Sequence, residues 1–218
     1  RVESDLDNIR SALSLAMSGG VDPVISVKFC VALLGFWTLR GYASEGRGLV
    51  KATLELPAIR DSDLAKAHAL YVGAGLAEAQ SDYAEACRML ESCLELRRGL
   101  GRPLDIAITL STLSLARLRR GEAASASVGE NEALRIFREL GERVDEGIAL
   151  LHLGQIAHHI GEDGQAITHL QQSLDMAREI ENPEVEGECL LMLGRCALEA
   201  RDFASAAQLL LSSYAVCS

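Results

Sequence analysis

The chain has 218 residues, and 49% of them are hydrophobic although only 4% are aromatic. Its formal net charge of −10 would repel a phosphate backbone, so we expect no direct binding of nucleic acid. Alanine and leucine supply most of the apolar positions and only four prolines interrupt the chain, a composition that favours helices over strands. We therefore expect an all-α protein.

The first expected helices lie in two N-terminal segments. Residues 1–20 are expected to form a capping helix, and the next helix includes the apolar run FCVALLGFWTL from Phe29 to Leu39. This run is uncharged but short, because Lys28 precedes it and Arg40 follows it. Because a spanning helix needs about 20 apolar residues, we interpret the run as a buried helix and expect no membrane segment.

The rest of the chain repeats itself with a period of about 40 residues. Five segments align without a gap: WTLRGYASEGRGLV from Trp37, AEAQSDYAEACRML from Ala77, RLRRGEAASASVGE from Arg117, AHHIGEDGQAITHL from Ala157 and ALEARDFASAAQLL from Ala197. Small residues share one register, at Gly46, Ala86, Ala126, Ala166 and Ala206. A second small register follows four residues after a recurring leucine, at Ala74, Ser114, Gly154 and Gly194. Such periodicity is typical of stacked helical units.

Each unit is predicted to consist of two helices. The first helix carries apolar residues at helical spacing, and a break follows it at Ser81, Gly121 or Gly161. Acidic residues recur in the first turn of the second helix, where they offset the positive end of the helix dipole, at Asp82, Glu122, Glu162 and Asp202. One unit alone cannot bury both of its faces, so we expect the units to stack into a solenoid.

The spacing of small and large residues at Gly154, Ala166, Leu170 and Ser173 resembles the tetratricopeptide repeat, and the resemblance covers residues 22 to 218. Each copy is a long variant, because the consensus unit of that family has about 34 residues. The resemblance implies a right-handed superhelical solenoid of antiparallel helix pairs. We expect five such repeats in one domain over residues 21–218.

A second resemblance starts at the N-terminus. The segments ESDLDNIRSALSLAM and FCVALLGFWTLRGYASEGRGLV are similar to the start of the repeat region in bacterial STAND-class transcriptional regulators of the LuxR and AfsR type. In that family a nucleotide-binding module and a DNA-binding domain lie elsewhere in the protein, and the repeats sense an inducer or hold a partner. Neither module is expected here, because GRGLVKAT at Gly46 and GAGLAE at Gly73 lack the full phosphate-binding motifs.

The family resemblance places the first helix of each pair on the concave face of the solenoid. The candidate groove residues are then His68, Tyr71, Ser111, Arg119, Leu151, Gln155, His158, His159, Leu191, Arg195 and Glu199. Apolar side chains with a few polar groups suit an apolar peptide segment, a partner helix or a modest organic ligand. The alternative interpretation is that these are ordinary half-exposed helix residues.

Neither a metal site nor a catalytic site is expected from the sequence. His152 and His159 lie seven residues apart, whereas a zinc pair on one helix needs a spacing of four, and His169 belongs to the following helix. No local motif unites a nucleophile with a base, so we expect neither enzyme activity nor a cofactor. Most cysteines lie among apolar helical residues without metal spacing, which favours reduced thiols and a cytoplasmic location.

The leading hypothesis is a non-catalytic repeat module that binds a protein or peptide, or senses a small-molecule inducer, within a larger bacterial signalling or transcription regulator. The rival hypothesis is a structural assembly module that self-associates through its open ends. The final segment LLLSSYAVCS is apolar where a terminal repeat normally carries a polar cap, so homodimerisation through the C-terminal helices is expected under the rival hypothesis.

Overall fold

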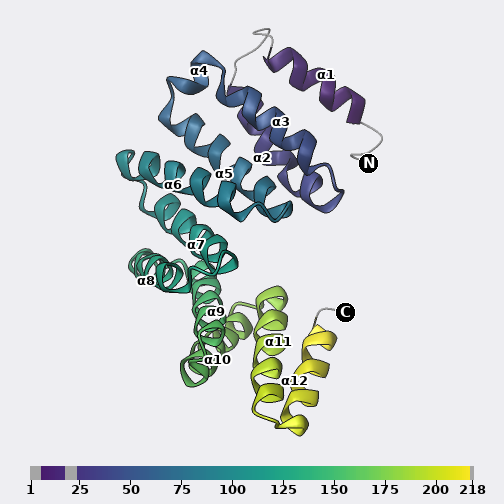
Figure 1. Ribbon diagram of the computed structural model, residues 1–218, viewed down its shortest axis with the longest axis vertical. Coiled ribbons are helices and arrows are strands. Elements are labelled where there is room, and N and C mark those ends of the chain that lie inside the picture. The colour runs from purple at the N-terminus through teal and green to yellow at the C-terminus, as the bar shows by residue number, and fades with distance from the viewer. Residues whose placement is uncertain (1–5, 18–23, 217–218) are drawn as a thin grey trace. The chain divides into compact units, whose positions relative to one another are not determined.

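The computed structural model describes residues 6–17 and 24–216, and these residues form helices joined by short turns (Figure 1). The described part contains no strand, so the predicted all-α fold class is confirmed. The helices are α1 (Leu6–Met17), α2 (Val24–Leu39), α3 (Ala43–Leu54), α4 (Pro57–Arg60), α5 (Asp63–Ala79), α6 (Tyr83–Gly99), α7 (Pro103–Arg119), α8 (Ala123–Leu140), α9 (Arg143–His159), α10 (Asp163–Glu179), α11 (Pro183–Glu199) and α12 (Phe203–Val216).

The chain divides into two compact units between Thr109 and Leu110. In the first unit, α2 packs against α3 and α5 packs against α6. In the second unit, α9 packs against α10 and α11 packs against α12, while α10 also contacts α11. Consecutive helices thus form packed pairs, as the repeat predicted. Parts of the predicted capping segment, residues 1–5 and 18–20, lie outside the described residues.

The turns between helices recur with the period of the sequence. Residues with positive φ follow the first helix of each pair, at Gly41, Ser81, Gly121, Gly161 and Arg201. Residues with positive φ also occupy three links between pairs, at Gly101, Gly141 and Glu181. A left-handed residue ends a helix because its backbone lets the following N–H groups reach the last helical carbonyls. The predicted breaks at Ser81, Gly121 and Gly161 are therefore confirmed.

The predicted small residues allow the paired helices to approach closely. Ala86, Ala126, Ala166 and Ala206 have no exposed surface. A β carbon on Gly154 would lie 2.6 Å from Leu170 Cγ, and one on Gly194 would lie 2.9 Å from Leu210 Cγ. Real β carbons do not approach other atoms so closely, so each glycine leaves room for a leucine of the partner helix.

The acidic register differs slightly from its predicted position. Asp82, Glu122 and Glu162 precede the first helical residue and are therefore N-cap residues. The carboxylate of Asp82 accepts a hydrogen bond from the Glu85 N–H at 3.2 Å, while Glu122 and Glu162 make no such side-chain cap. Aspartate is short enough to reach the orphan N–H groups of the first turn, which explains the difference.

The first repeat departs most from the others. Helix α3 has 12 residues, whereas α6 and α10 each have 17, and the short helix α4 occupies the link that follows. Pro57 starts α4, and a proline prevents the preceding residue from continuing a helix. This extra helix was not predicted from the repeat pattern.

The apolar run in α2 is half buried in the first unit. Cys30, Leu33 and Trp37 pack with Val72 and Leu76 of α5, while Val31 is exposed. No described helix is both long and apolar enough to cross a bilayer.

The cysteines of the described residues are buried and form no disulfide. Burial raises the pKa of the Cys30 and Cys189 thiols to about 11, so both stay protonated near neutral pH. Cys217 lies outside the described residues. The described thiols therefore behave as small apolar side chains of the helix contacts.

Candidate functional site

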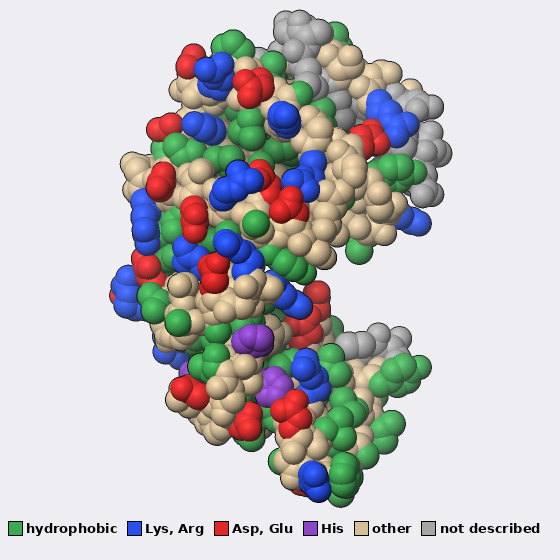
Figure 2. Space-filling model, in the orientation of Figure 1, with side chains coloured by type: hydrophobic (Ala, Val, Ile, Leu, Met, Phe, Trp, Pro, Cys, Tyr) green, Lys and Arg blue, Asp and Glu red, His purple; other side chains and the backbone are tan. Residues whose placement is uncertain are grey.

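The second unit contains a groove with a volume of about 640 Å³. Its walls come from the C-terminal ends of α7 and α9 and from α11, and they comprise Leu118, Arg119, Gln155, His158, His159, Glu188, Leu191, Met192, Arg195 and Glu199. Figure 2 shows histidine, basic and acidic side chains close together in the lower half of the view. The groove therefore offers hydrogen-bond donors and acceptors beside an apolar floor.

The exposure of the lining residues shows which of them a ligand could touch. Arg119, Arg195, Glu188 and Glu199 are exposed, and Leu191 is 46% exposed although it is apolar. The Arg195 Nη1 atom lies 3.6 Å from the sulfur of Met192, whose side chain forms part of the floor. Polar and charged side chains outnumber apolar ones in this lining, so the groove is more polar than a typical small-ligand pocket.

Seven of the residues predicted for the groove line this cavity, namely Arg119, Gln155, His158, His159, Leu191, Arg195 and Glu199. Leu118 also lines it and was not predicted, although it occupies the register of His158 one repeat earlier. Met192 is a further lining residue that was not predicted.

Leu151 and Ser111 are corrections to the predicted groove, because both are buried. Leu151 is 2% exposed and packs in a hydrophobic cluster with Leu170, Leu174 and Cys189. Leu191, in the same register one repeat later, is exposed because no helix pair follows α12 in the part of the chain that the structure describes. Leu151 is therefore a packing residue between consecutive repeats, whereas Leu191 lines the groove.

Ser111 belongs to a buried polar cluster with Glu130 and His152. The Ser111 hydroxyl donates to Glu130 Oε1 at 2.7 Å, and its oxygen lies 3.0 Å from His152 Nδ1. Glu130 Oε1 lies 3.3 Å from the same Nδ1 atom. In a catalytic triad the serine and the carboxylate contact opposite nitrogens of the imidazole, so this arrangement is not a nucleophile relay.

The two remaining predicted residues lie in the first unit. His68 lines an apolar pocket of about 500 Å³ with Val27, Val31 and Leu64. Burial, followed by the nearby Arg97 charge, lowers the pKa of His68. Tyr71 lies under the Arg97 guanidinium, whose carbon is 4.8 Å from the ring centroid. Tyr71 therefore packs against a buried arginine. Neither His68 nor Tyr71 lines the groove of the second unit.

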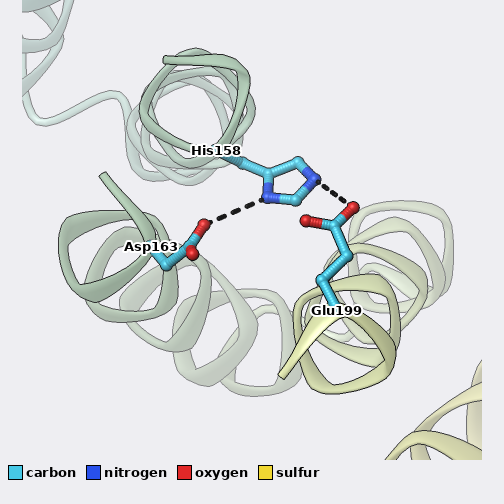
Figure 3. A group of neighbouring side chains, drawn as sticks. All are labelled: His158, Asp163 and Glu199. Carbon is cyan, nitrogen blue, oxygen red and sulfur yellow. Dashed lines mark ion pairs between the residues drawn. The ribbon is translucent and has the colours of Figure 1, made fainter. Parts of the chain in front are cut away.

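One cluster at the end of the groove was not predicted from the sequence. His158 of α9 lies between Asp163 of α10 and Glu199 of α11 (Figure 3). Its Nδ1 atom is 3.6 Å from Asp163 Oδ1, and its Nε2 atom is 3.5 Å from Glu199 Oε1. The Cys196 sulfur lies 3.7 Å from the same Nδ1 atom, and burial, with added repulsion from Asp163 and Glu199, raises the pKa of that thiol.

The family model of the tetratricopeptide repeat matches residues 145–218, which include α10, α11 and α12. Residues 145–218 therefore match the tetratricopeptide-repeat family in sequence. The tetratricopeptide resemblance seen in the sequence is confirmed over these residues, and the groove lies largely on helices within the matched segment. Comparison with curated proteins finds no sequence match.

Solved structures with the same fold extend this similarity to the remaining helices. BtubC (BKLC) from P. vanneervenii is 16% identical, with a TM-score of 0.78 over 99% of this chain and 89% of that protein. A Rap protein complexed with competence and sporulation factor is 16% identical, with a TM-score of 0.74 over 98% of this chain and 62% of that protein. At these identities the similarity shows a tetratricopeptide-repeat fold.

A signal transduction ATPase with numerous domains (STAND) from Pyrococcus horikoshii, which carries a tetratricopeptide repeat sensor, also shares the fold. It is 15% identical, with a TM-score of 0.72 over 99% of this chain but only 36% of that protein. The resemblance to the repeat region of STAND-class regulators therefore holds at the level of the fold.

Proposed function

We propose that the chain is a non-catalytic tetratricopeptide-repeat module that binds a protein or peptide segment in the groove of its second unit, within a larger bacterial signalling regulator. The observation that carries the proposal is the convergence of α7, α9 and α11 on one groove with exposed polar and apolar side chains. Each of these is the first helix of its pair, and the concave binding face of a repeat protein is formed by such equivalent helices of successive repeats.

The chemistry of the groove favours a peptide with both polar and apolar groups. Leu191 and Met192 offer contact area to an apolar side chain, and Gln155 can bond both the N–H and the C=O of a peptide backbone. Arg119 and Arg195 can donate to carbonyl or carboxylate oxygens. A small organic inducer would need fewer of these groups, which makes it the weaker candidate ligand.

Two structures with the same fold are consistent with a role in signalling. One is a Rap protein bound to competence and sporulation factor, and the other is a STAND protein with a tetratricopeptide repeat sensor. Neither similarity identifies a ligand for this chain. Both support the interpretation that helix pairs of this geometry serve as the binding part of a regulator.

Selection from a random peptide library displayed on phage tests the proposal. Enriched peptides are synthesised and titrated against the whole chain by fluorescence anisotropy. We expect Arg195→Glu to weaken binding by about tenfold or more, equivalent to about 1.4 kcal/mol, because it removes a donor and adds a repulsive charge. The matched control is Arg135→Glu on α8, where an exposed arginine pairs with Glu139 away from the groove. The proposal is contradicted if no peptide is enriched, or if the Arg195→Glu variant binds an enriched peptide as tightly as the wild-type chain does.

A second candidate function, self-association through α12, has one specific observation in its favour. Tyr214 is 75% exposed, whereas Leu174, in the same register one repeat earlier, is 3% exposed. Leu211 is also exposed, although its counterpart in the preceding repeat is the polar Gln171. Exposed apolar side chains that lie together on one helix often mark an interface, so α12 is a candidate dimer surface.

Light scattering after size exclusion tests self-association directly. A dimer of the wild-type chain that dissociates in Leu211→Glu would support an interface on α12. The matched control is Gln171→Glu, which adds the same charge at the equivalent exposed position of α10. A monomer at all accessible concentrations, or a dimer that Leu211→Glu leaves intact, contradicts this second function.

A further inference from the structure

We propose that His158, Asp163 and Glu199 bind a divalent transition-metal ion, for which Zn²⁺ is the probe. One imidazole nitrogen and two carboxylates would supply three ligands. A tetrahedral ion would then take a fourth ligand from water or from a bound partner. This inference does not depend on the peptide ligand, so either proposal can fail without the other.

The distances between the three side chains match a metal site. One candidate ligand atom from each residue lies within 4.8 Å of the other two. The short contacts involve different imidazole nitrogens, since Asp163 lies 3.6 Å from Nδ1 and Glu199 lies 3.5 Å from Nε2, so only one of them is a ligand–ligand distance for a single ion. Zinc bonds of about 2.0–2.2 Å in a tetrahedral site place neighbouring ligand atoms about 3.3–3.6 Å apart. Binding of one ion therefore requires one of the two carboxylates to turn toward the nitrogen that the other contacts. The Asp163 and Glu199 side chains are 61% and 60% exposed, which leaves them room to rotate.

His158 provides the fixed point of the site. Its side chain is only 9% exposed, and its ring lies between the two carboxylates (Figure 3). The Cys196 sulfur lies 3.7 Å from its Nδ1 atom. A ligand held in place before the ion arrives loses little conformational freedom on binding. The three ligands come from α9, α10 and α11, so a bound ion would join two consecutive helix pairs.

The choice of metal follows from the ligand types. Imidazole favours zinc, copper, iron or nickel, whereas magnesium and calcium prefer oxygen ligands alone. Three protein ligands with one open position are typical of zinc sites that also bind water or another ligand. His158 and Glu199 line the groove, so the open position could accept a carboxylate or imidazole from a bound partner.

Isothermal titration calorimetry of the purified whole chain with zinc chloride tests the site. We expect one Zn²⁺ per chain and no comparable binding of Mg²⁺. Loss of the nitrogen ligand in His158→Gln should weaken zinc binding by roughly a hundredfold or more, because even outer partners of metal ligands contribute tenfold to a hundredfold. Zinc should also raise the melting temperature of the wild-type chain, because it binds the folded state.

Two further variants make the test specific. Glu199→Gln changes an exposed ligand, so it should lower zinc affinity without disturbing the fold. It therefore distinguishes the loss of a ligand from the unfolding that His158→Gln could cause at a nearly buried position. His159→Gln changes the neighbouring exposed histidine and should bind zinc as the wild-type chain does. The proposal is overturned if the wild-type chain binds no zinc, if Mg²⁺ binds equally well, or if Glu199→Gln and His159→Gln bind zinc equally.

Discussion

Gly46 of α3 lies directly against the indole ring of Trp37 in α2. A β carbon built on Gly46 would be 2.8 Å from Trp37 Cδ2 and Cε3, and 3.0 Å from Leu76 Cδ1. Trp37 is itself buried, so it has little room to move aside. The other four repeats carry alanine in this register, at Ala86, Ala126, Ala166 and Ala206. The first repeat needs the smaller glycine because the side chain facing it is a tryptophan.

We predict that Gly46→Ala destabilises the fold by about 1–3 kcal/mol, since the added methyl group overpacks the contact between α2 and α3. The control is Gly48→Ala, two residues further along α3, where an added β carbon meets nothing within 4 Å. There the alanine should stabilise the helix by about 0.5–1 kcal/mol. Urea unfolding followed by the fluorescence of Trp37 measures both changes. Equal stability of the two variants would contradict the assigned helix contact.

The turn register allows a reciprocal exchange of residues. Ser81 and Gly161 occupy equivalent turns with φ of 59° and 80°. Ser81→Gly should stabilise the protein by up to about 1 kcal/mol because glycine adopts the left-handed conformation without strain. Gly161→Ala should destabilise it by about 1 kcal/mol for the same reason, although nothing crowds its β carbon. Thermal melting of both variants measures the effect, and a stabilised Gly161→Ala would contradict the turn geometry.

Helix caps offer a prediction in the segment that matches the tetratricopeptide-repeat model. The Asn182 side-chain oxygen accepts a hydrogen bond from the Val185 N–H at 3.2 Å, and Pro183 begins α11. Asn182→Ala should cost about 1 kcal/mol of unfolding free energy. Glu162→Ala is the control, because Glu162 is the N-cap of α10 without a side-chain cap, and its effect should stay within about 0.5 kcal/mol. Chemical denaturation compares the two variants, and equal losses would count against the cap at Asn182.

Two histidines predict how stability depends on pH. Burial lowers the pKa of His68 and of His169, with added repulsion from Arg97 and Arg138 respectively. When the pH falls below about 6.5, the unfolded chain gains these protons first, so the free energy of unfolding should decrease. The double variant His68→Gln, His169→Gln should lose less stability between pH 7 and pH 5 than the wild-type chain. Denaturant unfolding at both pH values measures this difference, and identical losses would contradict it.

The repeat made much of the fold predictable from the sequence. Helix pairs, small interface residues and turn positions all depend on local chemistry that recurs from one repeat to the next, such as the glycines at 121 and 161. Helix α4 was missed because Pro57 breaks the pattern in one repeat only. The repeat period therefore predicts the turns that recur in every unit, but it cannot predict a helix such as α4 that occurs in only one of them.

The groove was only partly predictable. Register predicted that His158, Arg195 and Glu199 share one face, and all three line one cavity. It could not show that Leu151 is buried while Leu191 is exposed. The cluster around His158 was missed because Asp163 starts a different helix and Glu199 belongs to the following repeat. Spacing rules for metal ligands on one helix cannot detect residues that meet across three helices.

The most direct test of the groove is photo-crosslinking with a peptide obtained by phage selection and resynthesised with a benzophenone side chain. Benzophenone reacts readily with methionine, and Met192 lies in the floor of the groove. We predict that mass spectrometry of the digested adduct places the crosslink on Met192 or on neighbouring residues of α9 and α11. Crosslinks that fall on α12, or among the residues around His68 in the first unit, would contradict the assignment of the groove as the binding site.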